Sequence, residues 1–309
     1  MDFVGNHILS VNQFDRADVE RIFAVADGMR PYAMRKRITR VLEGAIVSNM
    51  FFEPSTRTRV SFGSAFNLLG GEVRETTEVK ASSLAKGESL LDTAQTLDAM
   101  QADAVIIRHA ASGAPHFISE RISARVINAG DGMHEHPTQA LLDMKTIRDH
   151  FGKVEGLDIA IIGDIAHSRV ARSNLIALST CGATLRVAGP QTVLPRELAS
   201  AYGCTVCKNV TQAIEGAHVV MALRLQKERM TAGLLPNMRE YAIEFGINAK
   251  MLESTRPDAI LMHPGPVNRG VELSPDVVDG PRSVILDQVE NGVAVRCAVL
   301  YSILGGETP

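Results

Sequence analysis

The turn between an apolar strand and a helix decides the fold of this chain. The run Ala45-Ile46-Val47-Ser48-Asn49-Met50-Phe51 has the character of a buried strand, and residues 60–69 have that of a helix. Between them, Phe52-Glu53-Pro54-Ser55-Thr56-Arg57-Thr58-Arg59 places hydroxyl and guanidinium groups at the helix start. Unpaired N–H groups and the helix dipole favour an anion there, and arginine adds a planar donor fork. The stretch predicts a phosphate site, with an ordinary N-cap at Ser55 and solvated arginines as the alternative.

Helix and strand patterns alternate along nearly the whole chain, which predicts an α/β protein. Because 309 residues exceed the usual single core, we expect two doubly wound parallel-sheet domains, 1–150 and 151–287, joined by helices. We place the active site in the cleft between them and expect the closing helix, 288–305, to pack back on the first domain. The expected strands are 45–51, 72–76, 104–108, 125–129, 158–163, 184–188, 218–222, 259–262 and 284–286. The expected helices are 13–28, 56–69, 89–100, 137–150, 168–181 and 288–304, and weakly periodic segments cover 77–88 and 224–246.

Composition and charge exclude several classes of protein. The chain carries 32 Lys and Arg against 35 Asp and Glu, so its formal net charge of −3 does not indicate a nucleic-acid partner. No apolar run reaches membrane-spanning length, and the first residues lack the basic-then-apolar design of a signal peptide. We therefore expect a cytoplasmic protein that does not bind a membrane.

The four cysteines, Cys181, Cys204, Cys207 and Cys297, are too few for a disulfide framework in a chain of this length. Cys204 and Cys207 have the CxxC spacing of a redox or zinc half-site. They lie in an expected strand, where an odd separation directs the two sulfurs to opposite faces. Since no second CxxC completes a tetrahedral site, we interpret them as structural thiols.

The second half of the chain opens with its own strand–turn–helix unit, residues 158–181. A dinucleotide-binding unit is the rival interpretation of this pattern, but it requires G-x-G-x-x-G and only Gly163 is present. We therefore expect no nicotinamide or flavin, and no other cofactor is indicated.

Polar clusters follow several expected strands, where open α/β sheets place their ligands. Arg108 ends one strand and suits a phosphate together with a carbonyl, while pairing with a carboxylate is equally open. His134 and His136 have the spacing of a metal half-site, but no third ligand is apparent nearby, so we expect no metal. His136 and Gln139, at a helix start, better suit an uncharged carbonyl and its amide.

The second half carries a rigid turn and two arginines. Prolines fix the backbone of Met262-His263-Pro264-Gly265-Pro266, which allows its carbonyls to face a ligand N–H; a simple loop is the alternative. Arg169 and Arg224, with Gln226, together suit a small dicarboxylate. A phosphate site in one domain facing a carboxylate site in the other favours group transfer from a phosphorylated donor to an acidic acceptor.

Four motifs, Ser55–Arg59, His136–Gln139, Arg224–Arg229 and His263–Pro266, occur in order and in matching contexts. They resemble the catalytic chains of aspartate carbamoyltransferases, within the aspartate/ornithine carbamoyltransferase family, over essentially the whole length. Ornithine enzymes carry a cysteine in the turn equivalent to His263–Pro266, so ornithine is disfavoured. The resemblance implies transfer of the carbamoyl group of carbamoyl phosphate to the amine of L-aspartate, an early step of pyrimidine biosynthesis.

The resemblance also implies roles for individual residues. Carbamoyl phosphate would be bound by Ser55, Thr56, Arg57, Thr58, Arg108, His136, Gln139, Pro264 and Gly265. The catalytic residues among them would be Arg57, Thr58, Arg108 and His136. Aspartate would be bound by Lys86, Arg169, Arg224 and Gln226. Ser83 and Lys86 would come from the neighbouring subunit of a homotrimer with shared active sites.

Two departures from the family pattern stand out. One residue fewer separates serine from lysine in 82–88 than in some members, and Gly265 stands where others carry leucine. The residues do not indicate whether a regulatory or dihydroorotase partner chain exists. Another acceptor amino acid, such as ornithine, and a non-catalytic scaffold remain the alternatives; the latter would be expected to have lost one of Arg57, Arg108, His136 or Arg224.

Overall fold

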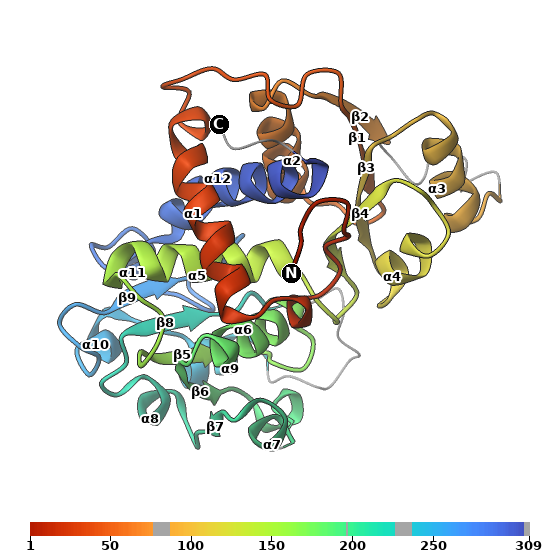
Figure 1. Ribbon diagram of the computed structural model, residues 1–309. Coiled ribbons are helices and arrows are strands. Elements are labelled where there is room, and N and C mark those ends of the chain that lie inside the picture. Colours follow the sequence, from red (N-terminus) through yellow and green to blue (C-terminus); the bar gives the residue numbers. More distant parts are fainter. Residues whose placement is uncertain (77–86, 196, 226–236, 306–309) are drawn as a thin grey trace. The chain divides into compact units, whose positions relative to one another are not determined.

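The chain forms two compact units, seen in a computed structural model (Figure 1). One unit contains Met1–Leu142 and the residues from Glu290 onward, and the other contains Asp143–Val289. Each is built on a purely parallel sheet, four-stranded in the first and five-stranded in the second. The predicted fold class, two parallel-sheet α/β domains, is confirmed. The residues that the structure describes are 1–76, 87–195, 197–225 and 237–305.

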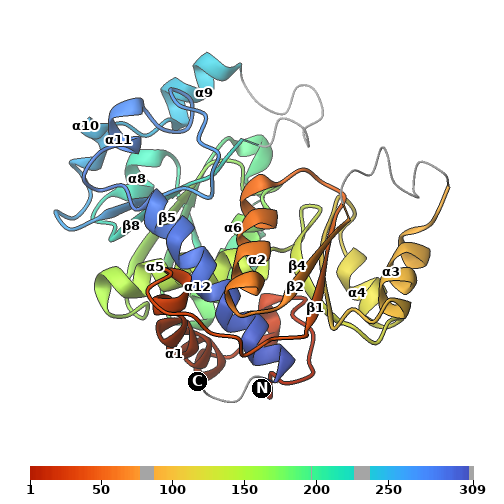
Figure 2. The ribbon, with the colours of Figure 1, turned by 90° about the horizontal axis from the view of Figure 1, so that it is seen from above.

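The first sheet has the strand order β2-β1-β3-β4. Its central strands are buried on both faces, as expected for apolar runs in a parallel sheet. Helices α2 and α12 lie on one face, and α3 and α4 on the other (Figure 2). The strands are β1 (Ile46–Phe51), β2 (Glu72–Thr76), β3 (Ala104–His109) and β4 (Arg125–Asp131). The helices of this unit are η1 (Val11–Gln13), α1 (Arg16–Ala33), α2 (Thr56–Leu68), α3 (Leu90–Ala99) and α4 (Ala114–Ser119).

Two long helices run across the division of the chain, α5 (Pro137–Phe151) and α12 (Ile285–Leu304). The C-terminal part of α12 packs in the first unit beside α2. There the Cys297 thiol donates to the Ala65 carbonyl at 3.6 Å, and the Arg296 guanidinium lies 4.9 Å from the centre of the Phe62 ring. The N-terminal and C-terminal ends of the chain therefore contribute to one core.

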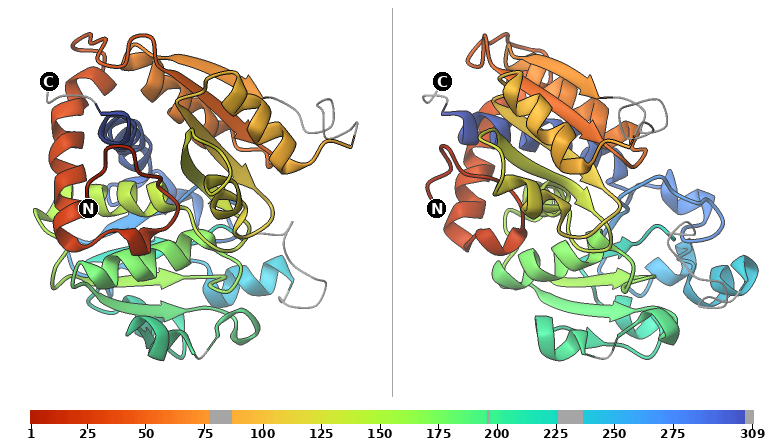
Figure 3. Two further views of the ribbon diagram at one scale, coloured as in Figure 1. Left: turned by 45° about the vertical axis from the view of Figure 1, so that its right-hand side comes forward. Right: turned by 90° about the vertical axis from the view of Figure 1, so that its right-hand side faces the viewer.

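The second sheet has the strand order β7-β6-β5-β8-β9. Helices α8, α10 and α11 contribute to the apolar core on one face, and α6 lies on the opposite face (Figure 3). The strands are β5 (Asp158–Ile162), β6 (Thr184–Ala188), β7 (Thr205–Val206), β8 (Val219–Ala222) and β9 (Ile260–Met262). The helices are α6 (Arg169–Thr180), η3 (Gln191–Val193), α7 (Leu198–Tyr202), α8 (Val210–Ile214), α9 (Met238–Phe245), α10 (Ala249–Leu252) and α11 (Pro275–Val278).

The predicted strand at 284–286 is wrong, because α12 begins at Ile285. The error has a physical origin. The Val284 N–H donates to the Leu261 carbonyl at 3.0 Å, and the Leu261 N–H donates to the Arg282 carbonyl at 2.7 Å, so extended backbone does run beside β9. The chain then turns directly into a helix, whose first residues are as apolar as a strand would be.

Two predicted segments also differ in extent. The first helix begins at Arg16 rather than at residue 13, because Asp15 caps it, and it continues past Gly28 to Ala33. The weakly periodic segment 224–246 contains helix α9, which begins at a capping box formed by Asn237 and Glu240. Most of the other weakly periodic segment, 77–86, lies outside the described residues.

Among the described residues, every helix is too short or too polar to cross a bilayer.

Candidate active site

The first sheet changes direction between β1 and β3. The chain proceeds from β1 to β2 on one side, then returns to add β3 and β4 on the other. Loops that leave the carboxyl ends of two such strands diverge and form a crevice where ligands bind. Phe51 and Arg108 are register partners at these ends, and the Phe52 N–H donates to the Arg108 carbonyl at 2.8 Å. The Ser55–Arg59 turn and Arg108 therefore lie at the carboxyl ends of two adjacent strands, β1 and β3, at the switch point.

Helix α2 begins immediately after this strand end. Ser55 occupies the N-cap position, but its side chain makes no capping hydrogen bond, and the first turn contains no acidic residue. The first N–H groups of α2 therefore do not bond to the Ser55 side chain, as they would if this serine were an ordinary N-cap. No carboxylate in the first turn neutralises the positive end of the helix dipole. Thr58 is buried while Arg57 is exposed. This arrangement suits an anion at the helix start.

Arg108 meets a carboxylate in this structure. Its Nε lies 3.5 Å from Oε2 of Glu53, and its Nη1 donates to the Ala129 carbonyl at 3.3 Å. Both side chains of the ion pair are mostly buried, so the pairing holds the guanidinium plane at the carboxyl end of β3. The sequence left pairing with a carboxylate open for Arg108, and the described structure contains that pair.

A buried carboxylate shapes the loop that follows β4. Asp131 is fully buried, and its Oδ1 accepts from the N–H of Glu135 at 3.0 Å. Its Oδ2 accepts from the N–H of Gly113 at 2.7 Å, which joins the start of α4 to the same residue. The Asp131 N–H also donates to the Glu135 carbonyl at 3.1 Å. These bonds fix the residue directly before His136.

His134 and His136 do not act as a pair. His134 Nδ1 lies 3.0 Å from Oδ2 of Asp131, so this ring belongs to the loop that Asp131 organises. His136 is buried at the entrance to α5 instead, one turn before Gln139. Among the described residues, no group of three or more His, Cys, Asp or Glu side chains has the arrangement of a metal site. The helix start thus places His136 and Gln139 near the carboxyl end of β4.

The second sheet has its own switch point, between β5 and β8. The chain leaves β5 toward β6 and β7, then returns to add β8 and β9 on the other side. Ile162 and Ala222 are register partners at the two carboxyl ends. Arg169 begins α6 after β5, and Arg224 follows β8, so both arginines arise at this edge. Arg169 is buried, which requires compensation of its charge.

Glu272 connects two segments of this edge. Its Oε1 accepts from the N–H of Leu225 at 2.9 Å, next to Arg224, and its Oε2 accepts from the N–H of Asn268 at 2.7 Å. Oε2 also lies 3.7 Å from Nε2 of His263. Burial by itself would raise the pKa of Glu272, but its hydrogen bonds to His263, Leu225 and Asn268 outweigh burial and lower that pKa. An ionised, buried carboxylate thus holds the Arg224 loop against the turn after β9.

The turn after β9 is fixed from within. His263 Nδ1 accepts from the Gly265 N–H at 2.8 Å, and the His263 N–H donates to Oε1 of Gln288 at 3.0 Å. Gln288 donates in turn to Asp143 at 2.8 Å, near the middle of α5. Gly265 has φ = +64°, a conformation that favours glycine over the leucine of other members. The turn therefore has a defined backbone that presents Pro264 and Gly265 at the sheet edge.

The structure places each described candidate at the carboxyl edge of its own sheet. Asp131 and Glu272 were missed by sequence reasoning. Asp131 offered a weak signal, since it stands between two glycines directly after an apolar strand, whereas nothing local marked Glu272. Three of the predicted site residues lie outside the described residues: Ser83, Lys86 and Gln226.

Comparison with known proteins matches two family models to consecutive parts of the chain. Residues 6–149 match the family model described as aspartate/ornithine carbamoyltransferase, carbamoyl-P binding domain. Residues 155–303 match the model described as the Asp/Orn binding domain of the same family. The chain belongs to the aspartate/ornithine carbamoyltransferase family. The resemblance stated from the four motifs is thereby confirmed.

Relatives within this family cover nearly the whole chain. The aspartate carbamoyltransferase catalytic subunit of Sorangium cellulosum is 53% identical over 302 residues, covering 97% of this chain and 93% of the relative. That of Desulfotalea psychrophila is 50% identical over 305 residues, covering 98% and 95%. Aspartate transcarbamoylase from Trypanosoma cruzi, solved in complex with carbamoyl phosphate and aspartate, is 33% identical with a TM-score of 0.89 and covers 98% of both chains.

Proposed function

We propose that this chain transfers the carbamoyl group of carbamoyl phosphate to the α-amine of L-aspartate, giving N-carbamoyl-L-aspartate and phosphate. The observation that carries the proposal is the Ser55–Arg59 turn, which stands at the switch point of the unit that matches a carbamoyl-phosphate-binding domain. The relatives that support aspartate as acceptor are themselves named aspartate carbamoyltransferases.

The first domain, residues 1–150 with the closing helix, is the carbamoyl-phosphate-binding domain in this proposal. The start of α2 binds the dianionic phosphate through its N–H groups, its hydroxyls and Arg57. Thr58, Arg108 and His136 donate to the carbonyl oxygen, where negative charge develops as the amine attacks. Gln139 and the backbone at Pro264 and Gly265 accept from the carbamoyl amide. The residues assigned to the phosphate are Ser55, Thr56, Arg57, Thr58 and Arg108.

The second domain, residues 151–287, is the aspartate-binding domain in this proposal. Arg169, Arg224 and Gln226 bind the two carboxylates, because paired guanidinium forks select a dicarboxylate over a monocarboxylate amino acid. Ornithine lacks the second carboxylate and carries an extra cation, which the same arginines repel. Selection of the acceptor therefore depends on this unit.

The chemical step needs no group beyond the two substrates and these side chains. The neutral amine of aspartate attacks the carbonyl carbon, a C–N bond forms, and the C–O bond to phosphate breaks. The amine loses one proton, and the leaving phosphate is the acceptor available to take it. Catalysis then consists of orientation and of electrostatic stabilisation of the tetrahedral intermediate.

The assembly proposed is a cytoplasmic homotrimer in which Ser83 and Lys86 reach the active site of a neighbouring subunit. The family resemblance supports this assembly. Mixing Lys86→Ala with Arg57→Ala protein, followed by subunit exchange, should restore activity, because some sites would then receive both intact residues. Exchange without any recovery, with the mixed trimers confirmed by mass, would contradict shared sites.

The reaction is tested by supplying carbamoyl phosphate with either L-aspartate or L-ornithine and measuring the ureido product. We expect turnover with aspartate and none above background with ornithine. Protein carrying Arg57→Ala, purified in the same way, controls for contaminating host enzyme. Turnover with ornithine alone would refute the acceptor assignment, and loss of turnover with both amino acids would support the scaffold alternative.

A further inference from the structure

A short N-terminal segment, residues 7–11, lies beside β4 in the first unit. The Ile8 N–H donates to the Val126 carbonyl at 2.9 Å, and the Asn128 N–H donates to the Ile8 carbonyl at 2.8 Å. The Asn128 side chain also donates to the Leu9 carbonyl at 2.9 Å. The segment pairs with β4 in the parallel direction, so its last residues reach the carboxyl end of that strand.

Glu135 connects this N-terminal segment to the loop that follows β4. Only 1% of its surface is exposed, and both carboxylate oxygens accept hydrogen bonds from the segment. Oε1 accepts from the Ser10 hydroxyl at 2.6 Å, and Oε2 accepts from the Val11 N–H at 2.7 Å. The Ser10 oxygen itself accepts from the Asn12 N–H at 3.1 Å, which leaves the hydroxyl proton for Glu135. Hydrogen bonds to a charged acceptor are stronger than neutral ones, so they offset the cost of burying this carboxylate.

The backbone is fixed on both sides of His136. Before it, the N–H and the carbonyl of Glu135 both bond to Asp131. After it, Pro137 begins α5, and the His136 carbonyl accepts from the Gln139 N–H at 3.0 Å. These bonds are local, whereas the Glu135 side chain anchors the same loop to a segment about 125 positions earlier in the sequence. The residue directly before His136 is therefore the point where the loop is held against the rest of the sheet.

We propose that Glu135 is a positioning residue for carbamoyl transfer, which acts by holding His136 at the carbonyl oxygen. The inference rests on the proposed function, in which His136 donates to that oxygen as negative charge develops. Such a donor must be held within roughly 0.5 Å of its working position, because electrostatic stabilisation depends on preorganisation. The anchor at Ser10 and Val11 supplies this constraint without touching either substrate. The N-terminal segment thus supports the chemical step as well as the fold.

Steady-state kinetics of Glu135→Ala with carbamoyl phosphate and L-aspartate test the proposal. We expect kcat to fall about tenfold or more because His136 loses its anchor, while the KM for aspartate stays within about twofold. The affinity for inorganic phosphate, which probes the Ser55–Arg59 turn, should also stay within about twofold of wild type. Glu135→Gln should recover most of the lost kcat, because its amide can accept from the Val11 N–H and donate to the Ser10 oxygen.

Combination with His136→Ala separates positioning from general stability. If Glu135 acts through His136, adding Glu135→Ala to a protein that already carries His136→Ala should lower kcat by no more than about twofold. A residue that only stabilises the fold would lower kcat by a similar factor in both backgrounds. Equal losses in the two backgrounds would therefore overturn the proposal.

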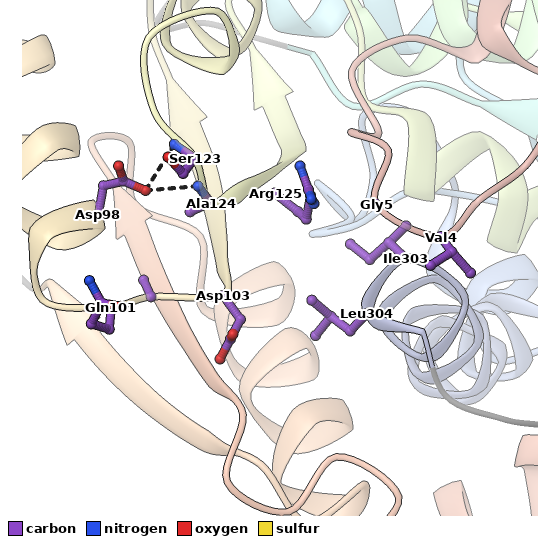
Figure 4. Close-up of a pocket in the computed structure, with 11 residues that line it drawn as sticks. Val4, Gly5, Asp98, Gln101, Asp103, Ser123, Ala124, Arg125, Ile303 and Leu304 are labelled. Carbon is purple, nitrogen blue, oxygen red and sulfur yellow. Dashed lines mark hydrogen bonds between the residues drawn. The ribbon is translucent and has the colours of Figure 1, made fainter.

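Asp98 provides a matched control at the opposite edge of the same sheet (Figure 4). It lines a hollow at the amino end of β4, and its Oδ1 accepts from the N–H groups of Ser123 and Ala124 at 3.0 and 2.8 Å. Asp98→Ala removes two hydrogen bonds to a carboxylate, as Glu135→Ala does. It should lower the free energy of unfolding, measured by urea titration, and leave kcat within about twofold of wild type. A loss of kcat equal to that of Glu135→Ala would contradict a specific role for Glu135.

Ser10→Ala tests the same anchor if Glu135→Ala fails to fold. It removes one of the two hydrogen bonds to Glu135, so kcat should fall about threefold or more with the KM for aspartate unchanged. Wild-type kcat in folded Glu135→Ala, or in Ser10→Ala where Glu135→Ala does not fold, would overturn the positioning role and leave the proposed reaction intact. Absence of turnover in the wild type would refute the proposed function itself, and the positioning role with it.

Discussion

The two sheets present their candidate residues in different ways. In the first unit, most of the residues assigned to the phosphate group are contiguous: a five-residue turn at the start of α2 brings hydroxyls, arginine and helix N–H groups to the switch point together. In the second unit, the candidate residues come from three separate loops, after β5, β8 and β9, and a buried carboxylate, Glu272, joins two of these loops.

One binding site can therefore be formed by contiguous residues, whereas the other depends on tertiary contacts between separate loops. A phosphate is recognised by features that one turn can supply, namely a helix start and adjacent donors. A dicarboxylate amino acid requires charged groups at defined distances, and the two arginines assigned to it, Arg169 and Arg224, come from separate loops. We therefore expect loss of a donor-site residue to abolish chemistry, and loss of a buried connector to shift affinity and stability more moderately.

The largest effect is expected from Arg57→Ala. Removal of a preorganised charged donor at developing charge should lower kcat/KM roughly a thousandfold, measured by initial rates of ureido product formation. Arg37→Ala, an exposed arginine in the same unit, serves as the matched control and should retain wild-type rates. A near-normal kcat/KM in Arg57→Ala would contradict the phosphate-binding role proposed for the Ser55–Arg59 turn.

Arg224→Ala should affect the other substrate. We expect kcat/KM for aspartate to fall about a hundredfold, since one carboxylate loses its charged partner. The affinity for carbamoyl phosphate, measured by equilibrium dialysis without aspartate, should stay within about twofold of wild type, because Arg224 is not among the residues assigned to that ligand. An equal loss in kcat/KM for aspartate and in affinity for carbamoyl phosphate would contradict the assignment of Arg224 to aspartate alone.

Asp131→Asn tests the buried connector of the first unit. The amide can keep one acceptor, but its NH₂ group would face an N–H that now donates to Asp131 Oδ1 or Oδ2. We expect a loss of about 1–3 kcal/mol in the free energy of unfolding, together with a lower kcat as the loop before His136 loosens. Urea titration and steady-state kinetics measure the two effects, and unchanged values of both would show that the network is dispensable.

Glu272→Gln tests the corresponding connector of the second unit. We expect the KM for aspartate to rise about tenfold and the free energy of unfolding to fall by about 1–3 kcal/mol, with little change in carbamoyl phosphate affinity. A folded-state pKa below the unfolded value adds stability that is present above the unfolded pKa, about 4.3, and is lost as pH falls through the folded pKa.

The pH dependence of Glu272→Gln provides the sharper test. Its stability difference from wild type should therefore be largest near neutral pH and should shrink under acid, as measured by urea titration across a pH series. Glu253→Gln, an exposed acid of the same unit, is the matched control and should show no such trend. A difference that grows on acidification would contradict an ionised Glu272.

The smallest effects are expected at Cys204 and Cys207. Both thiols are buried, and burial raises their pKa values. They should therefore react slowly with iodoacetamide at neutral pH until the protein is unfolded, as mass spectrometry would show. Cys204→Ala with Cys207→Ala should leave kcat/KM within about twofold of wild type. Rapid alkylation or a large loss of activity would contradict the structural interpretation.

Much of the fold follows from local patterns. Strand-like runs identified the regions of the strands in the two described sheets, although the strand expected around Cys204 and Cys207 is reduced to β7, Thr205–Val206. Caps such as Ser89 and Asp15 explain where helices start. The error at 284–286 arose because the apolar residues Val284, Ile285 and Leu286, where α12 begins, have the composition of a strand. Whether such a segment is strand or helix depends on tertiary contacts: the backbone up to Val284 pairs with Leu261 of β9, and α12 begins at the next residue.

The sequence by itself determined the turn rich in hydroxyls and arginine at the start of α2, the alternation that produces parallel sheets, and the family to which the chain belongs. These depend on contiguous residues, whose chemistry and spacing are visible without the fold. Only the tertiary structure decided that Asp131 and Glu272 hold the loops of the two sheet edges, that Arg108 pairs with Glu53, and that Glu135 joins the N-terminal segment to the loop before His136. The reason is physical: burial and hydrogen bonding between distant segments determine which charged groups are neutralised and which remain available.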